Sequence, residues 1–221
     1  MRKVSAIVVA AGAGRRFGSA KQFALLRGKT VLETCLEAIA GHPEVDELVL
    51  VLPAGESGAQ YRERWSKIIA VVRGGERRQD SVAHGFARLG SGPADLVLVH
   101  DGVRPLVSRE VITRVISRAG ETGAAVAAVP VEDTIKEAAG GFVVRTLERD
   151  NMQHIQTPQA FRYEVLERAL WQAREDGFYG TDEAALVERT GHPVAVVPGD
   201  RRNIKITTAA DLKIAEAWLE D

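Results

Sequence analysis

Three basic side chains crowd into one glycine-containing turn, directly after an apolar run near the start of the chain. Residues Ala10–Gln22 read AAGAGRRFGSAKQ and include Arg15, Arg16 and Lys21. Because glycine has no Cβ, successive backbone N–H groups of such a turn can approach phosphate oxygens and donate to them. Three neighbouring cations repel one another unless an anion lies between them. The segment therefore predicts a binding site for a triphosphate.

The turn matches neither of two common phosphate loops. A P-loop requires glycine before its lysine and serine or threonine after it, whereas Lys21 lies between Ala20 and Gln22. The dinucleotide-binding fingerprint requires a third glycine three residues after Gly14, but Phe17 stands at that position. We therefore expect the phosphates to be held by positive charge and not by the backbone alone.

Polar residues also follow two other apolar runs. Residues 74–81 read GGERRQDS and would offer N–H donors and side chains able to read a base edge, although an ordinary helix start explains much of this pattern. Asp101, beside Gly102, is suited to hold a magnesium ion or a ribose hydroxyl. Arg104 could either pair with Asp101 or bind a second phosphate. We expect His100 to be a hydrogen-bonded core histidine, since no second histidine has metal-ligand spacing to it.

Two segments nearer the C-terminus complete the set of candidates. Thr181, Asp182 and Glu183 would cap a helix whether or not they touch a substrate. Lys205 lies between two isoleucines in the segment Asn203–Ile206, which we expect to form a strand. Burying an ammonium group there is unfavourable without an anionic partner. Lys205 is therefore predicted to bind an anion.

The composition favours a cytoplasmic protein that binds small anions. The 221 residues are 45% hydrophobic and carry a formal net charge of -1, a poor match for nucleic acid or a membrane surface. One cysteine, Cys35, excludes a disulfide framework and a cysteine-rich metal site, and we expect it to be a small buried side chain. The N-terminal apolar run is far too short to span a membrane.

Short β-branched runs alternate along the chain with stretches of helical periodicity. We expect strands at 4–9, 48–52, 68–72, 96–99, 125–129 and 194–197. We expect helices at 31–40, 80–89, 109–119 and 162–176, with Asp80 and Ser108 as caps. Connections of this length imply an α/β fold with a mostly parallel sheet in a single domain. In such sheets ligands bind beyond the carboxyl ends of the strands, where the polar segments occur.

Residues 131–158 break this alternation. The sequence VEDTIKEAAGGFVVRTLERD alternates polar and apolar residues around Gly140 and Gly141, as a β-hairpin does. A two-stranded ribbon is only marginally stable in water on its own, so another surface must cover it. A second copy of the chain is the simplest cover. We therefore predict a protruding β-arm that joins two chains in a homodimer.

Eight segments together carry a family resemblance. In order they read AAGAGRRFGSAKQ, GGERRQDSV, VHDGVRP, PVEDTIK, TLERD, QTPQAF, TDEA and NIKIT. From residue 4 to about residue 219 the chain resembles the 2-C-methyl-D-erythritol 4-phosphate cytidylyltransferases of non-mevalonate isoprenoid biosynthesis. The resemblance implies a Rossmann-like nucleotidyltransferase fold, Mg²⁺ or another divalent cation, and a dimer joined by the β-arm. It also implies transfer of CMP from CTP to the sugar-alcohol phosphate, giving 4-diphosphocytidyl-2-C-methyl-D-erythritol and pyrophosphate.

The same resemblance implies roles for individual residues. CTP would be bound by Ala10, Ala11, Gly12, Ala13, Gly14, Arg15, Gly75, Glu76 and Ser81. The catalytic residues would be Arg16 and Lys21, which stabilise the transition state, and Arg149 and Lys205, which hold the attacking phosphate. The acceptor would contact Asp101, Arg104, Thr134 and Thr181, and Asp101 would also meet a metal ion held mainly by the CTP phosphates. Two features depart from the family pattern: no proline precedes Lys21, and Asn151–Gln153 replaces a leucine–tryptophan pair.

Two other functions stay open at this point. Cytidylyltransferases acting on ribitol 5-phosphate share most of these motifs, and only the acceptor pocket separates the two activities. Arg149 in TLERD, together with QTPQAF and Asn203–Lys205, favours methylerythritol phosphate. A non-catalytic module that binds CTP without turnover would keep the same fold, but the presence of Lys21, Asp101 and Lys205 argues against it.

Overall fold

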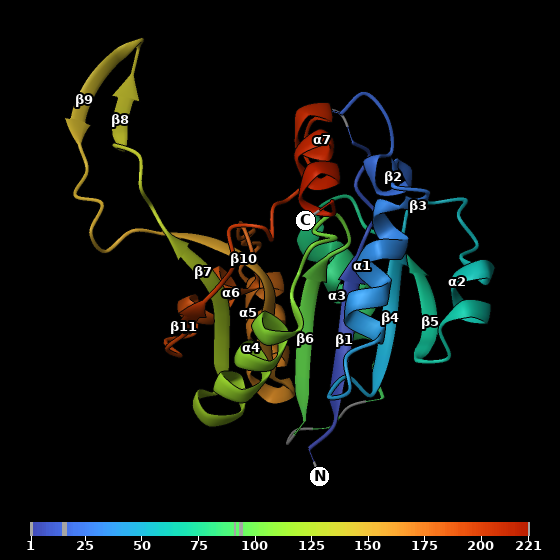
Figure 1. Cartoon of the computed structure of the whole chain (residues 1–221). Helices are drawn as coiled ribbons and strands as arrows, with labels where there is room; N and C mark the ends of the chain where they lie inside the picture. The colour runs from blue at the N-terminus through green and yellow to red at the C-terminus, as the bar shows by residue number, and fades with distance from the viewer. Residues whose placement is uncertain (1, 15–16, 91, 93–94, 221) are drawn as a thin grey trace.

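A seven-stranded sheet runs through the centre of the molecule in this computed structural model, which describes residues 2–14, 17–90, 92 and 95–220 (Figure 1). The strand order is β11-β7-β10-β6-β1-β4-β5. The strands are β1 (Val4–Val9), β4 (Glu47–Leu52), β5 (Ile68–Arg73), β6 (Leu96–Asp101), β7 (Ala124–Pro130), β10 (Gln153–Arg162) and β11 (Ala195–Pro198). Neighbouring strands are parallel except where β10 pairs with β6 and β7. The expected α/β fold with a mostly parallel sheet is confirmed.

Helices cover both faces of this sheet (Figure 1). On one face pack α1 (Val31–Ala40) and α4 (Arg109–Thr122), and on the other α3 (Arg78–Phe86), α5 (Tyr163–Glu175) and α6 (Glu183–Arg189). All residues of β6 are buried as a result, which explains why uninterrupted apolar runs marked the central strands. In the described part of the chain, no helix has both the length and the apolar character that a bilayer span requires.

Short elements that were not expected from the sequence complete the fold. They are the 3-10 helix η1 (Lys21–Phe23), β2 (Leu25–Leu26), β3 (Lys29–Thr30), α2 (Ala59–Arg64) and α7 (Ala209–Trp218). A small core that includes Leu26, Val103, Ile206 and Ala215 packs α7 against β2 and against the loop after β6. This packing brings the segment before α7, which contains Lys205, to the carboxyl end of β6.

Two details of the expected secondary structure are wrong. Asp80 is not the N-cap of α3, which is Arg77; it is the third helical residue, and its carboxylate accepts a capping-box hydrogen bond from the backbone N–H of Arg77 at 3.0 Å. Residues 203–206 form no strand: Ile206 belongs to the small core, Ile204 packs against it, and the backbone N–H of Ile206 donates to the carbonyl of Val103 at 2.9 Å. Ser108 caps α4 as expected.

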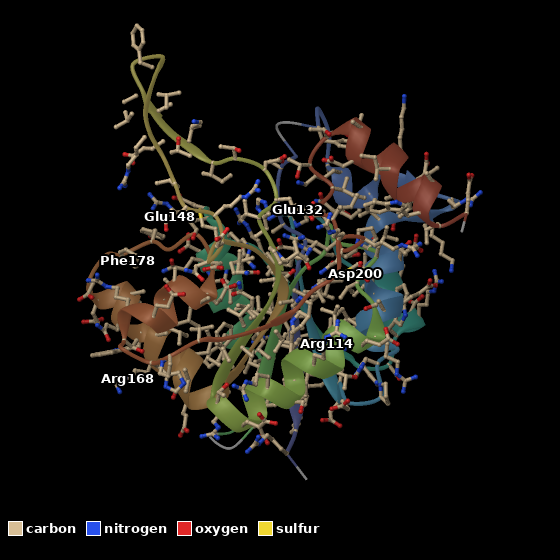
Figure 2. The ribbon with its side chains drawn as sticks, turned by 60° about the vertical axis from the view of Figure 1, so that its left-hand side comes forward. Arg114, Glu132, Glu148, Arg168, Phe178 and Asp200 are labelled. Atoms are coloured by element: carbon tan, nitrogen blue, oxygen red, sulfur yellow. The ribbon has the colours of Figure 1, made fainter. Side chains whose placement is uncertain are left out.

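The expected hairpin consists of β8 (Lys136–Ala139) and β9 (Phe142–Thr146) and protrudes from the body of the molecule (Figures 1 and 2). Its two turn glycines have φ angles of +58° and +85°, which suit a two-residue type I′ turn. Every residue of both strands is exposed. Because the chain from Gln153 onward belongs to β10 of the main sheet, the hairpin is shorter than the expected segment 131–158.

Cys35 lies on α1 and is fully buried, as expected. Burial and the nearby negative charge of Asp101 raise the pKa of its thiol far above the ordinary value. A thiol that stays protonated is unreactive, so Cys35 serves as a small apolar side chain of the core.

Candidate active site

A cavity of about 380 Å³ opens beyond the carboxyl end of β1. Three parts of the chain that the sequence singled out form its walls: residues 10–13, residues 75–78 and Asp101. The side chains of Lys21, Ser81 and Lys205 also line it. The fold therefore brings together most of the residues that resemblance assigned to CTP.

The loop after β1 keeps its shape through one glycine and one buried side chain. Gly14 has a φ angle of +64°, and a Cβ at this position would lie 1.8 Å from a carbonyl oxygen of the same turn, so only glycine fits. The buried side-chain amide of Gln22 donates to the carbonyl of Gly12 at 3.2 Å. A Cβ on Gly12 would meet nothing within 4 Å, which leaves room for a ligand. Arg15 and Arg16 lie outside the described residues.

The segment before α3 packs tightly against this loop. A Cβ on Gly74 would lie 2.2 Å from the Cβ of Ala11, so the Gly74 backbone packs directly against the methyl group of Ala11. The backbone N–H of Gly75 donates to Oγ of Ser81 at 3.1 Å, and Ser81 Oγ donates to the carbonyl of Arg77 at 3.1 Å. These bonds fix the segment before any ligand binds.

Asp101 ends β6 at this cavity and gathers three cations. Its buried carboxylate accepts from Arg78 Nε at Oδ1 (2.9 Å) and from Lys205 Nζ at Oδ2 (2.8 Å). Arg104 Nε lies 3.8 Å from Oδ2. Burial raises the pKa of Asp101, but the three positive charges outweigh that effect and hold the pKa well below its ordinary value. Asp101 is therefore ionised, and it is the anionic partner that Lys205 was expected to need.

A second cavity, of about 300 Å³, adjoins the first. The side chains of Arg78, Asp101 and Lys205 line both cavities. The remaining walls of the second cavity come from β10, from Arg104 and from the loop before α6, which contains Thr181. Two ligands, one in each cavity, can therefore both contact the charged side chains that the cavities share.

His100 is the buried, hydrogen-bonded histidine that the sequence predicted. Thr157 Oγ1 accepts from the backbone N–H of Asp101 at 3.0 Å, so its own hydroxyl donates to His100 Nδ1 at 3.1 Å. His100 Nε2 then carries the proton and donates to the carbonyl of Arg104 at 3.2 Å. Burial lowers the pKa of His100 to about 4, so the ring stays neutral and positions the loop after β6.

Two candidate residues lie away from both cavities. Thr134 and Arg149 belong to the connections between the hairpin and the body, and neither lines the first or the second cavity. Arg149 is exposed, and its Nη1 donates to the backbone carbonyl of Glu132. Figure 2 shows Glu132 and Glu148 near the base of the hairpin. The structure therefore separates these two residues from the rest of the predicted acceptor site.

Sequence reasoning missed Arg78, which lines both cavities. Besides contacting Asp101, its Nη1 donates to both carboxylate oxygens of Glu183, at 2.8 and 2.7 Å. Burial lowers the pKa of the guanidinium, but the two carboxylates outweigh burial and raise it, so Arg78 stays charged. The only signal in the sequence was an arginine next to a predicted helix start, after a buried strand.

Comparison with known proteins finds similarity over almost the whole chain. Residues 4–221 match the family model described as 2-C-methyl-D-erythritol 4-phosphate cytidylyltransferase (IspD). The protein of that description from Syntrophus aciditrophicus is 44% identical over 226 residues, which cover 99% of this chain and 96% of that protein. Its counterpart from Pelotomaculum thermopropionicum is 45% identical over 228 residues, 100% of this chain and 95% of that protein. The crystal structure of the enzyme from Thermus thermophilus has a TM-score of 0.84 and 37% identity, over 99% of this chain and 100% of that chain.

Proposed function

The chain belongs to the family of 2-C-methyl-D-erythritol 4-phosphate cytidylyltransferases, and we propose that its two cavities hold the two substrates of that reaction side by side. The enzyme transfers the cytidylyl group of CTP to 2-C-methyl-D-erythritol 4-phosphate in isoprenoid biosynthesis, and pyrophosphate leaves. The observation that carries the proposal is the wall of Arg78, Asp101 and Lys205 that both cavities share. Such a wall offers fixed charge where two polyanions must react.

The first cavity is assigned to CTP and the second to the acceptor. Residues 10–13 with Gly75, Glu76 and Ser81 offer backbone and side-chain groups to the nucleoside and its phosphates, and Lys21 adds positive charge. Family resemblance adds Gly14, Arg15 and Arg16 to this set. In the second cavity Arg104, Thr181 and Lys205 are assigned to the acceptor phosphate.

The reaction needs positioning and charge, and it needs no general base. The second pKa of a phosphate monoester is about 6, so the attacking oxygen is already an anion at neutral pH. This oxygen attacks the α-phosphorus of CTP in line, the bond from the α-phosphorus to the bridging oxygen breaks, and pyrophosphate takes the electron pair. Lys21 and Arg16 neutralise the charge that develops, while Lys205 orients the attacking phosphate.

A divalent cation belongs to this chemistry, and magnesium is the proposed ion. Within the described ranges, no three histidine, cysteine or acidic side chains gather where they could hold a metal. A nucleotide-bound Mg²⁺ usually takes one or two protein carboxylates and completes its shell with phosphate oxygens and water. Asp101 already accepts from Arg78 and Lys205, but each carboxylate oxygen has a second acceptor position, so Asp101 would meet an ion held mainly by the CTP phosphates at the wall of the first cavity. The ion would supply charge neutralisation to those phosphates.

A homodimer joined by the β-arm is also part of the proposal; the arm is β8, β9 and the connection at each end. Phe142, Val143 and Val144 on this arm are 79%, 60% and 59% exposed. An apolar row on a two-stranded ribbon is unstable in water without a partner surface. Dimerisation would also set where Thr134 and Arg149 lie relative to an acceptor cavity.

The whole chain is proposed to act as one nucleotidyltransferase domain with the arm as an insertion. The main sheet supports this, since it draws its strands from residues 4 to 198. The single, buried Cys35 supports a cytoplasmic location. The near-neutral net charge supports small anions, not nucleic acid or membranes, as partners.

Placing aspartate at both Phe142 and Val144 should convert the dimer to monomers. Both residues are exposed apolar side chains of β9, and two charges there would oppose burial in an interface. Light scattering after size-exclusion chromatography measures the mass. Lys136→Gln, on the polar partner strand, should leave the dimer intact. A wild-type chain with the mass of one copy would contradict the proposed interface.

Arg149→Ala should raise KM for the sugar phosphate by about tenfold with little change in KM for CTP, the effect of losing one charge-assisted hydrogen bond. Initial rates of pyrophosphate release, with one substrate varied at a time, separate the two constants. Arg145→Ala is the matched control, because Arg145 lies on the same arm and pairs with exposed Glu137 at 2.5 Å. A selective loss of CTP affinity in Arg149→Ala would contradict the acceptor assignment.

Magnesium-dependent release of pyrophosphate from CTP tests the function with two acceptors in parallel. We expect turnover with 2-C-methyl-D-erythritol 4-phosphate and none with ribitol 5-phosphate. Turnover with ribitol 5-phosphate alone would keep the fold and the chemistry but change the acceptor. Protein that binds CTP and turns over neither acceptor would be a nucleotide-binding module.

A further inference from the structure

Arg78 joins three elements at the wall between the two cavities. It is the first residue of α3, and its Nε donates to Asp101 at the end of β6 at 2.9 Å. Its Nη1 donates to Glu183, the first residue of α6, at 2.8 and 2.7 Å. Asp101 is 5% exposed and Glu183 is 1% exposed. We call Arg78, Asp101 and Glu183 the clamp.

The charge of Arg78 is already matched within the protein. It faces two buried carboxylates, so its guanidinium retains little attraction for a substrate phosphate. The charges of Lys205 and Arg104 are less completely neutralised than that of Arg78. Among the described residues, Asp101 is the ion-pair partner of both, so they must share its single negative charge. The net positive charge of the site therefore resides on Lys205 and Arg104, and Arg78 contributes geometry.

The clamp fixes the walls of the second cavity more than those of the first. The loop before α6 contains Thr181, which lines the second cavity and not the first. Gln79, the neighbour of Arg78, ties the same loop to α3: its amide donates to the carbonyl of Phe178 at 3.1 Å and accepts from the N–H of Gly180 at 3.0 Å. The CTP side has its own hydrogen bonds through Ser81. Loss of Arg78 would therefore release the acceptor side first.

We infer that Arg78, acting through Glu183 and Asp101, is a positioning residue that sets the geometry of the acceptor cavity. The inference rests on the proposed function, because that function assigns the second cavity to the acceptor. Arg78 keeps Asp101 Oδ1 occupied while Oδ2 faces Lys205, and it fixes the Thr181 loop against α3. Lysine cannot replace it, because an ammonium group lacks the rigid fork that reaches two separate carboxylates.

Steady-state kinetics of Arg78→Lys and Glu183→Gln test this inference. Each variant should raise KM for the acceptor phosphate by about tenfold or more. Kd for magnesium–CTP, measured by calorimetry without acceptor, should change by less than about twofold. The double variant should be no worse than Arg78→Lys alone, because both changes break the same clamp.

Arg189→Lys is the matched control. Arg189 ends α6, pairs with exposed Asp176 at 2.9 Å and lines neither cavity, so both constants should stay at their wild-type values. It reports whether any weakened contact of α6 is enough to disturb the site. An effect of Arg189→Lys as large as that of Arg78→Lys would overturn the inference.

The kinetic and binding constants of the two test variants also decide the inference. An unchanged KM for the acceptor in Arg78→Lys and Glu183→Gln would overturn it, and so would an equal rise in Kd for CTP. If Arg78→Lys shows no cooperative thermal transition, Glu183→Gln decides by the same two constants. If wild type releases no pyrophosphate, the proposed function fails, and the Kd of the acceptor measured by calorimetry in each variant then decides the inference.

Discussion

Replacing Lys21 with alanine should lower kcat by at least about two orders of magnitude. Lys21 lines the first cavity beside residues 10–13, where its charge is proposed to neutralise the α-phosphoryl group of CTP as pyrophosphate departs. A preorganised charge of this kind stabilises the transition state more than the bound substrate, so kcat falls more than CTP affinity. Pyrophosphate release at saturating concentrations of both substrates measures the effect.

Lys29→Ala is the matched control for Lys21. Lys29 lies on β3, is exposed, pairs with Glu37 at 2.8 Å and lines neither cavity. Exposed ion pairs contribute little, so this change should leave kcat within about twofold of wild type. An unchanged kcat in Lys21→Ala would remove Lys21 from the mechanism.

The fold could be predicted wherever burial imposes a local pattern. β1, β4 and β6 lie inside the sheet with helices on both faces, so each contains a continuous run of four or five apolar residues that is visible in the sequence. β2 and β3 have two residues each, too few to show any period. The strand expected at 203–206 failed because Ile204 and Ile206 pack into the small core beside α7 and not into a sheet.

The site could be predicted as far as the fold forces its residues together. Parallel strands end at one edge, so the segments after β1, β5 and β6 must meet there. The sequence could not assign a role to Arg78. Its partners Asp101 and Glu183 lie 23 and 105 positions away, and no local sequence pattern indicates that they are in contact with it. The sequence left Arg104 undecided, and the structure gives it Asp101 at 3.8 Å and the carbonyl of Asn203 at 2.7 Å.

Replacing Asp101 with asparagine should destabilise the protein and remove most of its activity. Removing one partner of a buried ion pair costs on the order of 3–5 kcal/mol. Arg78 keeps Glu183, and the Lys205 side chain, which is 38% exposed, can turn to solvent, but Arg104, which is 12% exposed, loses its ion-pair partner, so the unfolding free energy should fall by an amount within this range. Lys205 also loses the carboxylate that orients it, so kcat/KM for the acceptor should fall about a hundredfold or more.

Unfolding by urea at neutral pH measures the stability change, with Asp176→Asn as control. Asp176 pairs with Arg189 at 2.9 Å on the surface, where such a pair contributes at most about 1 kcal/mol. Steady-state rates of both variants test the effect on activity. An Asp101→Asn protein as stable as Asp176→Asn would contradict a buried charge network centred on Asp101.

The pH dependence of the stability difference between wild type and Asp101→Asn separates the effect of the Asp101 charge from the effect of its shape. Because the pKa of Asp101 is held below its ordinary value, its contribution to stability is present above the unfolded-state pKa of about 4 and is lost as pH falls through the folded-state pKa. The gap in unfolding free energy between wild type and Asp101→Asn should stay constant from about pH 8 to about pH 5 and shrink below about pH 4. Asparagine has the shape of aspartate but does not titrate, so a gap that persists in acid would come from packing. A gap that closes assigns the effect to the carboxylate charge on which Arg78, Arg104 and Lys205 converge.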